Sequence, residues 1–125
     1  MVKDDYFVIA FKVLAYLYAV LKSKEVFSQK KYDKAIGKKE INEEYLNRIY
    51  KMMSDDGLIE GAVFQKAWGN VYIPLFEENE LQITSKGIQF LEENDSMKRA
   101  GRFLQDKADV ICNVLISAGL EYLIR

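Results

Sequence analysis

The chain begins with an almost unbroken apolar stretch. Residues 6–21 are apolar or aromatic except for Lys12. Asp4 and Asp5 precede this stretch, where acidic side chains favour the positive end of a helix dipole. The pattern predicts a helix over residues 4–23. Because such a helix is apolar on all sides, another element or another subunit must cover it on a second side.

A membrane span or an export signal is disfavoured for this segment. Lys12 interrupts the apolar run, which falls short of the ~20 residues of a spanning helix. An export signal starts with basic residues and ends at a cleavage site of small residues, whereas Asp4 and Asp5 precede this segment and Lys22 and Lys24 follow it. The chain contains one cysteine, so no intrachain disulfide can form. We therefore expect a cytoplasmic protein with no membrane partner.

Two shorter amphipathic helices are predicted over residues 28–57. Ser28 can cap the first helix, and Gly37 can end it. Asn42 stands before two acidic residues and can cap the second helix, which Gly57 ends. Apolar side chains recur at helical spacing along the second helix, at Leu46, Ile49, Tyr50 and Met53. The pattern predicts a helix-turn-helix unit.

The next part of the chain predicts strands. Residues 62–74 are rich in β-branched and aromatic side chains around a Gly-Asn pair at positions 69–70, which is typical of a hairpin. Short strands before and after it complete a small antiparallel sheet over residues 58–83. Thr84 then caps a helix over residues 84–94.

A last helix is predicted over residues 96–125. Its apolar positions are spaced by threes and fours, as in a packing seam between helices. The seam predicts a homodimer interface at Leu104, Ile111, Leu115, Ala118 and Tyr122. A ligand pocket between the subunits is the alternative interpretation of the apolar terminal helices.

Two motifs in this order of elements resemble the winged-helix pattern. A helix that ends in Gly-Leu-Ile at 57–59 is followed by Leu-x-Ile-Thr-x-Lys-Gly-x-x-Phe-Leu at 81–91. In winged-helix proteins, the recognition helix runs into a strand, and the strand after the wing turns into the next helix. More narrowly, residues 41–100 resemble the YjcQ family of small winged-helix proteins from Gram-positive bacteria and their phages. The resemblance implies an α+β, mostly α fold with a winged helix-turn-helix and a small antiparallel sheet. The predicted first and last helices are longer than the short form of that family requires, and we expect a single winged-helix domain over residues 1–125. The resemblance implies no established activity.

Three residues give these motifs a physical meaning. Gly57 can adopt the left-handed conformation that reverses a helix into a strand. Thr84 can satisfy backbone amides where a strand becomes a helix. Gly87 allows that helix to approach the sheet closely. We therefore expect these two regions to belong to one compact unit.

Composition narrows the range of functions. Acidic and basic residues nearly cancel, with a net charge of -1, so any surface for nucleic acid must be local. The chain has no histidine and one cysteine, Cys112, which removes the commonest general base and the usual zinc ligands. We expect no enzyme activity, no metal and no other cofactor. Cys112 is expected to be a buried packing thiol.

Lysine residues suggest where DNA would bind. Residues 22–39 contain seven lysines and two acidic residues, Glu25 and Asp33. Phosphate contacts are expected from Lys30, Lys31, Lys34, Lys38 and Lys39. A solvated surface with no ligand is the alternative interpretation.

The second helix of the helix-turn-helix unit would be the recognition helix. On it, Asn47 could pair with adenine, Arg48 with guanine edges, and Lys51 with phosphate. However, residues 43–60 contain two basic and five acidic residues, which opposes binding to a phosphate backbone. Trp68 is expected to pack the hairpin against the domain rather than to stack on bases.

Three classes of function follow. The leading interpretation is a small bacterial or phage transcriptional regulator that binds double-stranded DNA as a dimer. The second is a winged-helix protein-interaction module that does not bind DNA, which the acidic recognition helix and the low net charge favour. An enzyme that uses paired carboxylates is the third.

Overall fold

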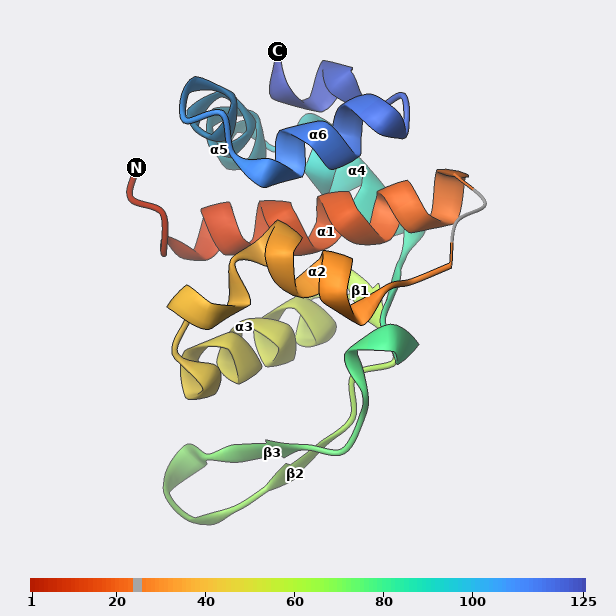
Figure 1. The fold of residues 1–125 in the computed structure, drawn as a ribbon. Helices are drawn as coiled ribbons and strands as arrows, with labels where there is room; N and C mark the ends of the chain where they lie inside the picture. The colour runs from red at the N-terminus through yellow and green to blue at the C-terminus, as the bar shows by residue number, and fades with distance from the viewer. Residues whose placement is uncertain (24–25) are drawn as a thin grey trace.

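The computed structural model describes residues 1–23 and 26–125, and it arranges their helices around a central one (Figure 1). Lys24 and Glu25 of the lysine-rich stretch lie outside the described residues. Helices α2 and α3 lie on one side of α1, and α4, α5 and α6 lie on the other (Figure 1). The bounds are α1 Tyr6–Ser23, α2 Gln29–Ile36, α3 Glu43–Asp55, α4 Ser85–Glu93, α5 Asp95–Asp106 and α6 Val110–Ser117.

Helix α1 forms the centre of the core. Eleven of its side chains are buried, because helices of the same chain cover it on two sides. The predicted helix is confirmed, and no second subunit is needed to cover it. With 18 residues and a mean hydropathy of 1.5, α1 has the length and composition of a membrane span, but 61% of it is buried inside the fold. The core helix of a globular protein has the same properties.

Lys12, the one buried charge of this helix, takes part in a largely buried ion pair. Its Nζ lies 3.3 Å from Oδ2 of Asp109, and the two side chains are 8% and 26% exposed. Oδ1 of Asp109 also accepts a hydrogen bond of 3.1 Å from the backbone amide of Ile111 and so caps α6. The ion pair therefore ties α1 to the start of α6.

The predicted caps of α2 and α3 are confirmed. Oγ of Ser28 accepts a hydrogen bond from the amide of Lys31, and Oδ1 of Asn42 accepts one from the amide of Tyr45. Gly37 ends α2 with a φ of 67°, and Gly57 follows α3 with a φ of 75°. A short 3-10 turn, η1 (Lys38–Glu40), joins the two helices.

The strands form two antiparallel pairs. Ile59 of β1 (Ile59–Glu60) lies opposite Ile83 of β4 (Gln82–Ile83). The predicted hairpin is confirmed as β2 (Phe64–Lys66) and β3 (Tyr72–Pro74), which project beyond α3 (Figure 1). Its turn contains η2 (Trp68–Asn70), in which Gly69 and Asn70 both have a positive φ, and η3 (Glu78–Glu80) follows the hairpin. The predicted small sheet is thus split into two.

The two motif regions lie in one compact unit, as expected. The amide of Thr84 donates a hydrogen bond of 3.1 Å to the carbonyl of Leu58, next to the pair of β1 and β4. Oγ1 of Thr84 accepts a hydrogen bond of 2.9 Å from the amide of Gly87 and caps α4. A Cβ atom on Gly87 would lie 2.2 Å from the carbonyl oxygen of Leu58, so only glycine allows this approach.

The prediction of one continuous helix over residues 96–125 is wrong. Helix α5 ends at Asp106, and Ala108 has a φ of 52°, which turns the chain into α6. Gly119, with a φ of 74°, follows α6 and leads to a last 3-10 turn, η4 (Glu121–Ile124). The apolar spacing arises because each short segment turns one face towards the core. The α+β, mostly α class is confirmed.

Candidate nucleic-acid interface

Four of the five predicted phosphate-binding lysines are exposed, and three of them, Lys30, Lys34 and Lys39, lie on α2 and η1 away from α6. Lys30 and Lys34 stand one helical turn apart on α2. They lie on the side of α2 opposite to its buried side chains, Tyr32, Ala35 and Ile36. Lys39 is exposed on η1. We call Lys30, Lys34 and Lys39 the exposed lysine group.

Lys31 belongs to a different part of the surface. It lines a groove of about 250 Å³ together with residues of α1 and α6, among them Ala19 and Asn113. The side chain therefore lies on the flank of α2 that faces α6.

Lys38 is held by acidic side chains of the same chain. Its Nζ lies 2.5 Å from Oε1 of Glu78 and 3.9 Å from Oδ1 of Asp33. Burial lowers the pKa of Lys38, but the hydrogen bond to Glu78 and the charges of Glu78, Asp33 and Glu43 together outweigh burial, so this pKa is raised overall. Lys38 therefore has an internal partner in place of a phosphate.

A buried chain of hydrogen bonds continues from Glu78. The hydroxyl of Tyr50 donates to Oε2 of Glu78 at 2.5 Å, and the hydroxyls of Tyr32 and Tyr50 are also 2.5 Å apart. Nε2 of Gln29 donates to Oε1 of Glu78 at 2.9 Å. Burial raises the pKa of both tyrosines, so both hydroxyls stay protonated. This network joins α2 and α3 to the base of the hairpin.

The hairpin lies against the outward side of α3. Nη1 of Arg48 donates a hydrogen bond of 2.8 Å to the carbonyl of Asn70, and Cζ of Arg48 lies 5.5 Å from the centre of the Tyr72 ring. Nζ of Lys51 lies 5.0 Å from the centre of the same ring and 2.7 Å from Oδ2 of Asp55. The charge of Lys51 is thus balanced within α3.

Arg48 keeps an exposed guanidinium despite these contacts. A guanidinium has several N–H donors, so the bond to Asn70 positions the group while it can still donate to a base or a phosphate. Asn47 precedes it and is half buried. Glu43 and Glu44, in the first turn of α3, are both exposed.

The helices α2 and α3 carry an excess of basic residues, and the hairpin region carries an excess of acidic residues. Residues 28–54 contain seven basic and four acidic residues, whereas residues 55–80 contain one basic and six acidic residues. Lys38 offsets one of these acids, Glu78. Any surface for a phosphate backbone therefore lies on the helical part of this region.

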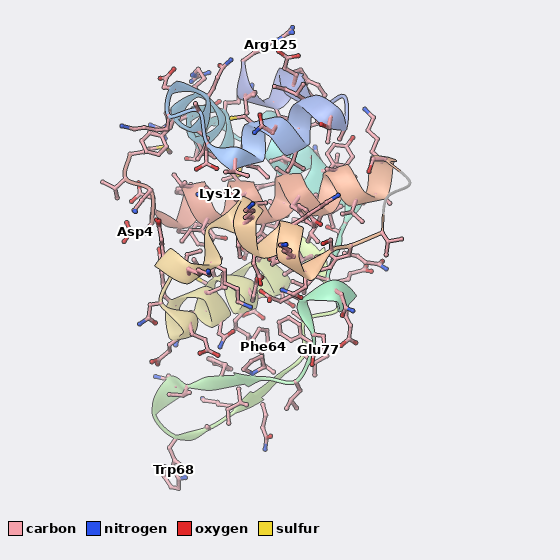
Figure 2. All side chains as sticks on the ribbon, in the orientation of Figure 1. Asp4, Lys12, Phe64, Trp68, Glu77 and Arg125 are labelled. Atoms are coloured by element: carbon pink, nitrogen blue, oxygen red, sulfur yellow. The ribbon has the colours of Figure 1, made fainter. Side chains whose placement is uncertain are left out.

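Trp68 corrects a prediction, because it does not pack against the domain. Its side chain is 96% exposed, and Figure 2 shows it at the far end of the hairpin. The packing role belongs to aromatic residues of the other face. The ring centres of Phe64 and Phe76 lie 5.3 Å apart, and those of Tyr50 and Phe76 lie 5.9 Å apart. These contacts anchor the hairpin and leave its tip in solvent.

The predicted dimer interface is mostly inside a single chain. Leu104, Ile111 and Leu115 are each no more than 1% exposed, so a second copy could not contact them without opening the fold. The reason is the break between α5 and α6, which turns the apolar seam into the core. Ala118 is half buried, and Tyr122 is exposed with its hydroxyl donating to Glu92.

The chemistry of the remaining candidate groups is limited. Cys112 is buried, as predicted, and burial raises the pKa of its thiol. In the described part of the chain, no three cysteine or carboxylate side chains lie close enough together to hold a metal ion. The sequence missed the role of Glu78, because an acidic turn gives no local signal of a distant lysine and tyrosine.

The chain is similar to a known protein family. A family model described as YjcQ protein matches residues 11–110. No curated protein and no solved structure matches the chain. The matched region runs from α1 to the start of α6 and so includes α2, α3, the hairpin and α4. Because the match covers well over half of its residues, this chain belongs to the YjcQ family.

Proposed function

We propose that this chain is a winged-helix protein that binds double-stranded DNA. Helices α2 and α3 would form the helix-turn-helix unit, and the β2–β3 hairpin would be the wing. The order of elements supports this assignment, since α3 runs through Gly57 into β1 and the chain returns from the hairpin through β4 into α4. A small bacterial or phage regulator in the cytoplasm is the role that fits this fold.

One observation carries the proposal, namely the exposed basic side chains on the helical part of this region. The exposed lysine group and Arg48 present their charges to solvent on α2, η1 and α3. Lysine and arginine side chains that neutralise phosphates release counterions, and this release drives binding to any duplex sequence. Lys38 and Lys51, which are paired with Glu78 and Asp55, contribute less in this proposal.

Arg48 is the residue that we propose for reading bases. The carbonyl of Asn70 and the ring of Tyr72 hold its guanidinium at the junction of α3 and the hairpin. A guanidinium held in this way loses less side-chain freedom when it pairs with a guanine edge. Asn47 would assist from the flank of the same helix.

A salt series tests this proposal. Binding of the protein to a random duplex would be measured by fluorescence anisotropy at several salt concentrations. We expect the affinity to fall steeply with salt, and the double variant Lys30→Gln, Lys34→Gln to reduce the slope by about one for each lysine. Lys98→Gln, an exposed change on α5 on the other side of α1, is the matched control. Binding that is absent at low salt, or that does not change with salt, rejects DNA binding.

The second candidate is a protein-interaction module with the same shape. The exposed Glu43 and Glu44 on α3 and the internal pairing of Lys51 favour it. The salt series distinguishes the two functions, because this module would not bind a duplex. A homodimer remains a proposal in either case, and it would have to use exposed side chains such as Tyr122 in place of the buried seam.

A further inference from the structure

The outer face of the β2–β3 hairpin is an exposed apolar strip. Gln65 lies opposite Ile73, and the amide of Leu75 donates a hydrogen bond of 2.8 Å to the carbonyl of Val63. Because side chains alternate along a strand, these residues point away from the face that carries Phe64. The apolar members of the strip and their exposed fractions are Val63 54%, Val71 37%, Ile73 46% and Leu75 57%.

The apolar side chains of this strip are typical of a strand face that another surface covers. On the inner face, Phe64 and Phe76 are partly buried against the core, and the half-buried ring of Tyr72 packs on Phe64. A hairpin with one solvated face usually alternates apolar and polar residues, whereas apolar side chains on both faces are typical of strands covered on both sides. At the paired positions, the outer face carries Gln65 and Ile73, and the inner face carries one charged side chain, Lys66. Contiguous exposed apolar groups mark interaction sites.

Acidic residues stand at the base of the strip. Glu60 precedes the first strand of the hairpin, and Glu77 follows the second. Both side chains are exposed, and Figure 2 shows Glu77 at the base of the hairpin and Trp68 at its far end. Acidic side chains repel a phosphate backbone, and Gln65 carries the one side-chain hydrogen-bond donor among the outer-face residues named above. The outer face therefore does not suit DNA.

We propose that the outer face of the hairpin binds a partner protein through an apolar segment that is flanked by basic residues. The strip would bury the apolar segment, and Glu60 and Glu77 would attract its lysine or arginine side chains. Trp68 would act as an anchor at the far end, since exposed tryptophan residues often dominate the energy of an interface. This proposal does not depend on DNA binding, because it uses the face of the hairpin directed away from Arg48 and Lys51.

Selection from a random peptide library tests the proposal. The folded full chain would be immobilised, peptides would be enriched on it, and the enriched peptides would be synthesised and titrated. We expect apolar peptides with basic flanks, whose affinity falls about tenfold in the double variant Ile73→Thr, Leu75→Thr. Threonine is β-branched and favours strands, so the hairpin should stay folded. Circular dichroism and urea unfolding check that it does.

Two further variants make the test specific. Val26→Thr changes an apolar side chain that is 87% exposed and lies before α2, so it should leave peptide binding unchanged. Glu60→Lys should weaken the peptides with basic flanks and strengthen versions of the same peptides with acidic flanks.

Four outcomes would overturn the proposal. The first is a failure to enrich any peptide, and the second is binding that the double variant leaves unchanged. The third is loss of duplex affinity in the double variant, which would assign the strip to DNA. The fourth is self-association of the wild-type chain that Ile73→Thr and Leu75→Thr abolish in sedimentation experiments, which would make a second copy the occupant. Loss of salt-dependent duplex binding alone would reject the proposed function and leave this proposal standing.

Discussion

The hydroxyl of Thr84 donates a hydrogen bond of 2.6 Å to the backbone carbonyl of Gly57. The same oxygen accepts a hydrogen bond from the amide of Gly87. One side chain therefore binds the chain at the end of α3 and caps the start of α4, although Thr84 and Gly57 are 27 residues apart in the sequence. The hairpin leaves the domain between these two points, so this contact fixes the base from which the hairpin projects.

Replacement of Thr84 should destabilise the fold measurably. Thr84→Val removes both the donor to Gly57 and the acceptor for Gly87 while it keeps the shape of the side chain. We expect a loss of about 1–2 kcal/mol in the free energy of unfolding, measured in urea, because a helix loses its cap and a partly buried carbonyl loses its partner. Thr84→Ser keeps the hydroxyl and should cost much less. Equal losses in both variants would contradict this account.

Gly87→Ala should destabilise the protein even though alanine favours helices. The added Cβ would lie 2.2 Å from the carbonyl oxygen of Leu58 and 2.9 Å from Cγ1 of Ile83. The clash with backbone forces α4 away from β1, for which we expect a loss of about 3 kcal/mol. Gly119→Ala, where no atom lies within 4 Å of the added Cβ, should cost about 1–2 kcal/mol from its positive φ alone. If α4 did not approach β1 this closely, urea unfolding would show a larger loss of stability for Gly119→Ala than for Gly87→Ala.

The buried tyrosines should make the fold sensitive to alkaline pH. Burial raises the pKa of Tyr32 and Tyr50 in the folded state above the ordinary value of 10.0. Their contribution to stability is therefore fully present below pH 10 and is lost as the pH rises further, because only the unfolded chain releases these protons. In this range, the free energy of unfolding should fall by about 1.4 kcal/mol per pH unit for each of the two tyrosines.

The variant Tyr50→Phe tests this dependence. It removes one of the two protons, so the free energy of unfolding should fall less steeply with pH above 10 than in the wild-type chain. The variant should also be less stable at neutral pH, because Glu78 and Tyr32 lose a hydrogen-bond partner. A slope identical to that of the wild-type chain would show that Tyr50 ionises in the folded state.

Removal of the charge at position 109 should leave Lys12 without its counter-charge. The variant Asp109→Asn keeps a side-chain oxygen that can cap α6, so the loss reports on the ion pair. Because Lys12 is only 8% exposed, we expect a loss of about 3 kcal/mol. Lys12→Met combined with Asp109→Asn should recover much of this loss, since it removes both charges. Thermal unfolding measures these losses, and Asp106→Asn, an exposed change at the end of α5, is the control.

Local signals in the sequence identified most helix boundaries correctly. Ser28, Asn42 and Thr84 each cap the helix that they were expected to cap, and Gly57 ends α3. A cap forms between residues that are two or three positions apart, so short stretches of sequence carry the information. The hairpin turn at Gly69 follows for the same reason.

The C-terminal region shows where local signals fail. Ala108 favours helices, yet its φ is positive here, and the apolar spacing continues from Leu104 to Ile111 across the break. Asp109 was the available signal, since an acidic residue before an apolar run can cap a new helix. Packing of α6 on α1, together with the ion pair to Lys12, decides the break.

The candidate site depended even more on distant contacts. Five lysines were expected to act together, but Lys31 lines a groove beside α6 and Lys38 is bound to Glu78. Trp68 was expected to pack, but the inner face of the hairpin is filled by other aromatic residues. Composition cannot show which of two apolar faces meets the domain.

The sequence by itself determined the order of helices and strands as far as α4, most of their caps and turns, and the mostly α class, because hydrogen bonds and apolar periodicity over a few residues specify them. Only the tertiary structure decided which charges stay free and which apolar face stays exposed. Both outcomes depend on contacts between side chains that are far apart in the sequence, such as Lys38 with Glu78 and Arg48 with Tyr72. These contacts form only when the whole core has packed around α1.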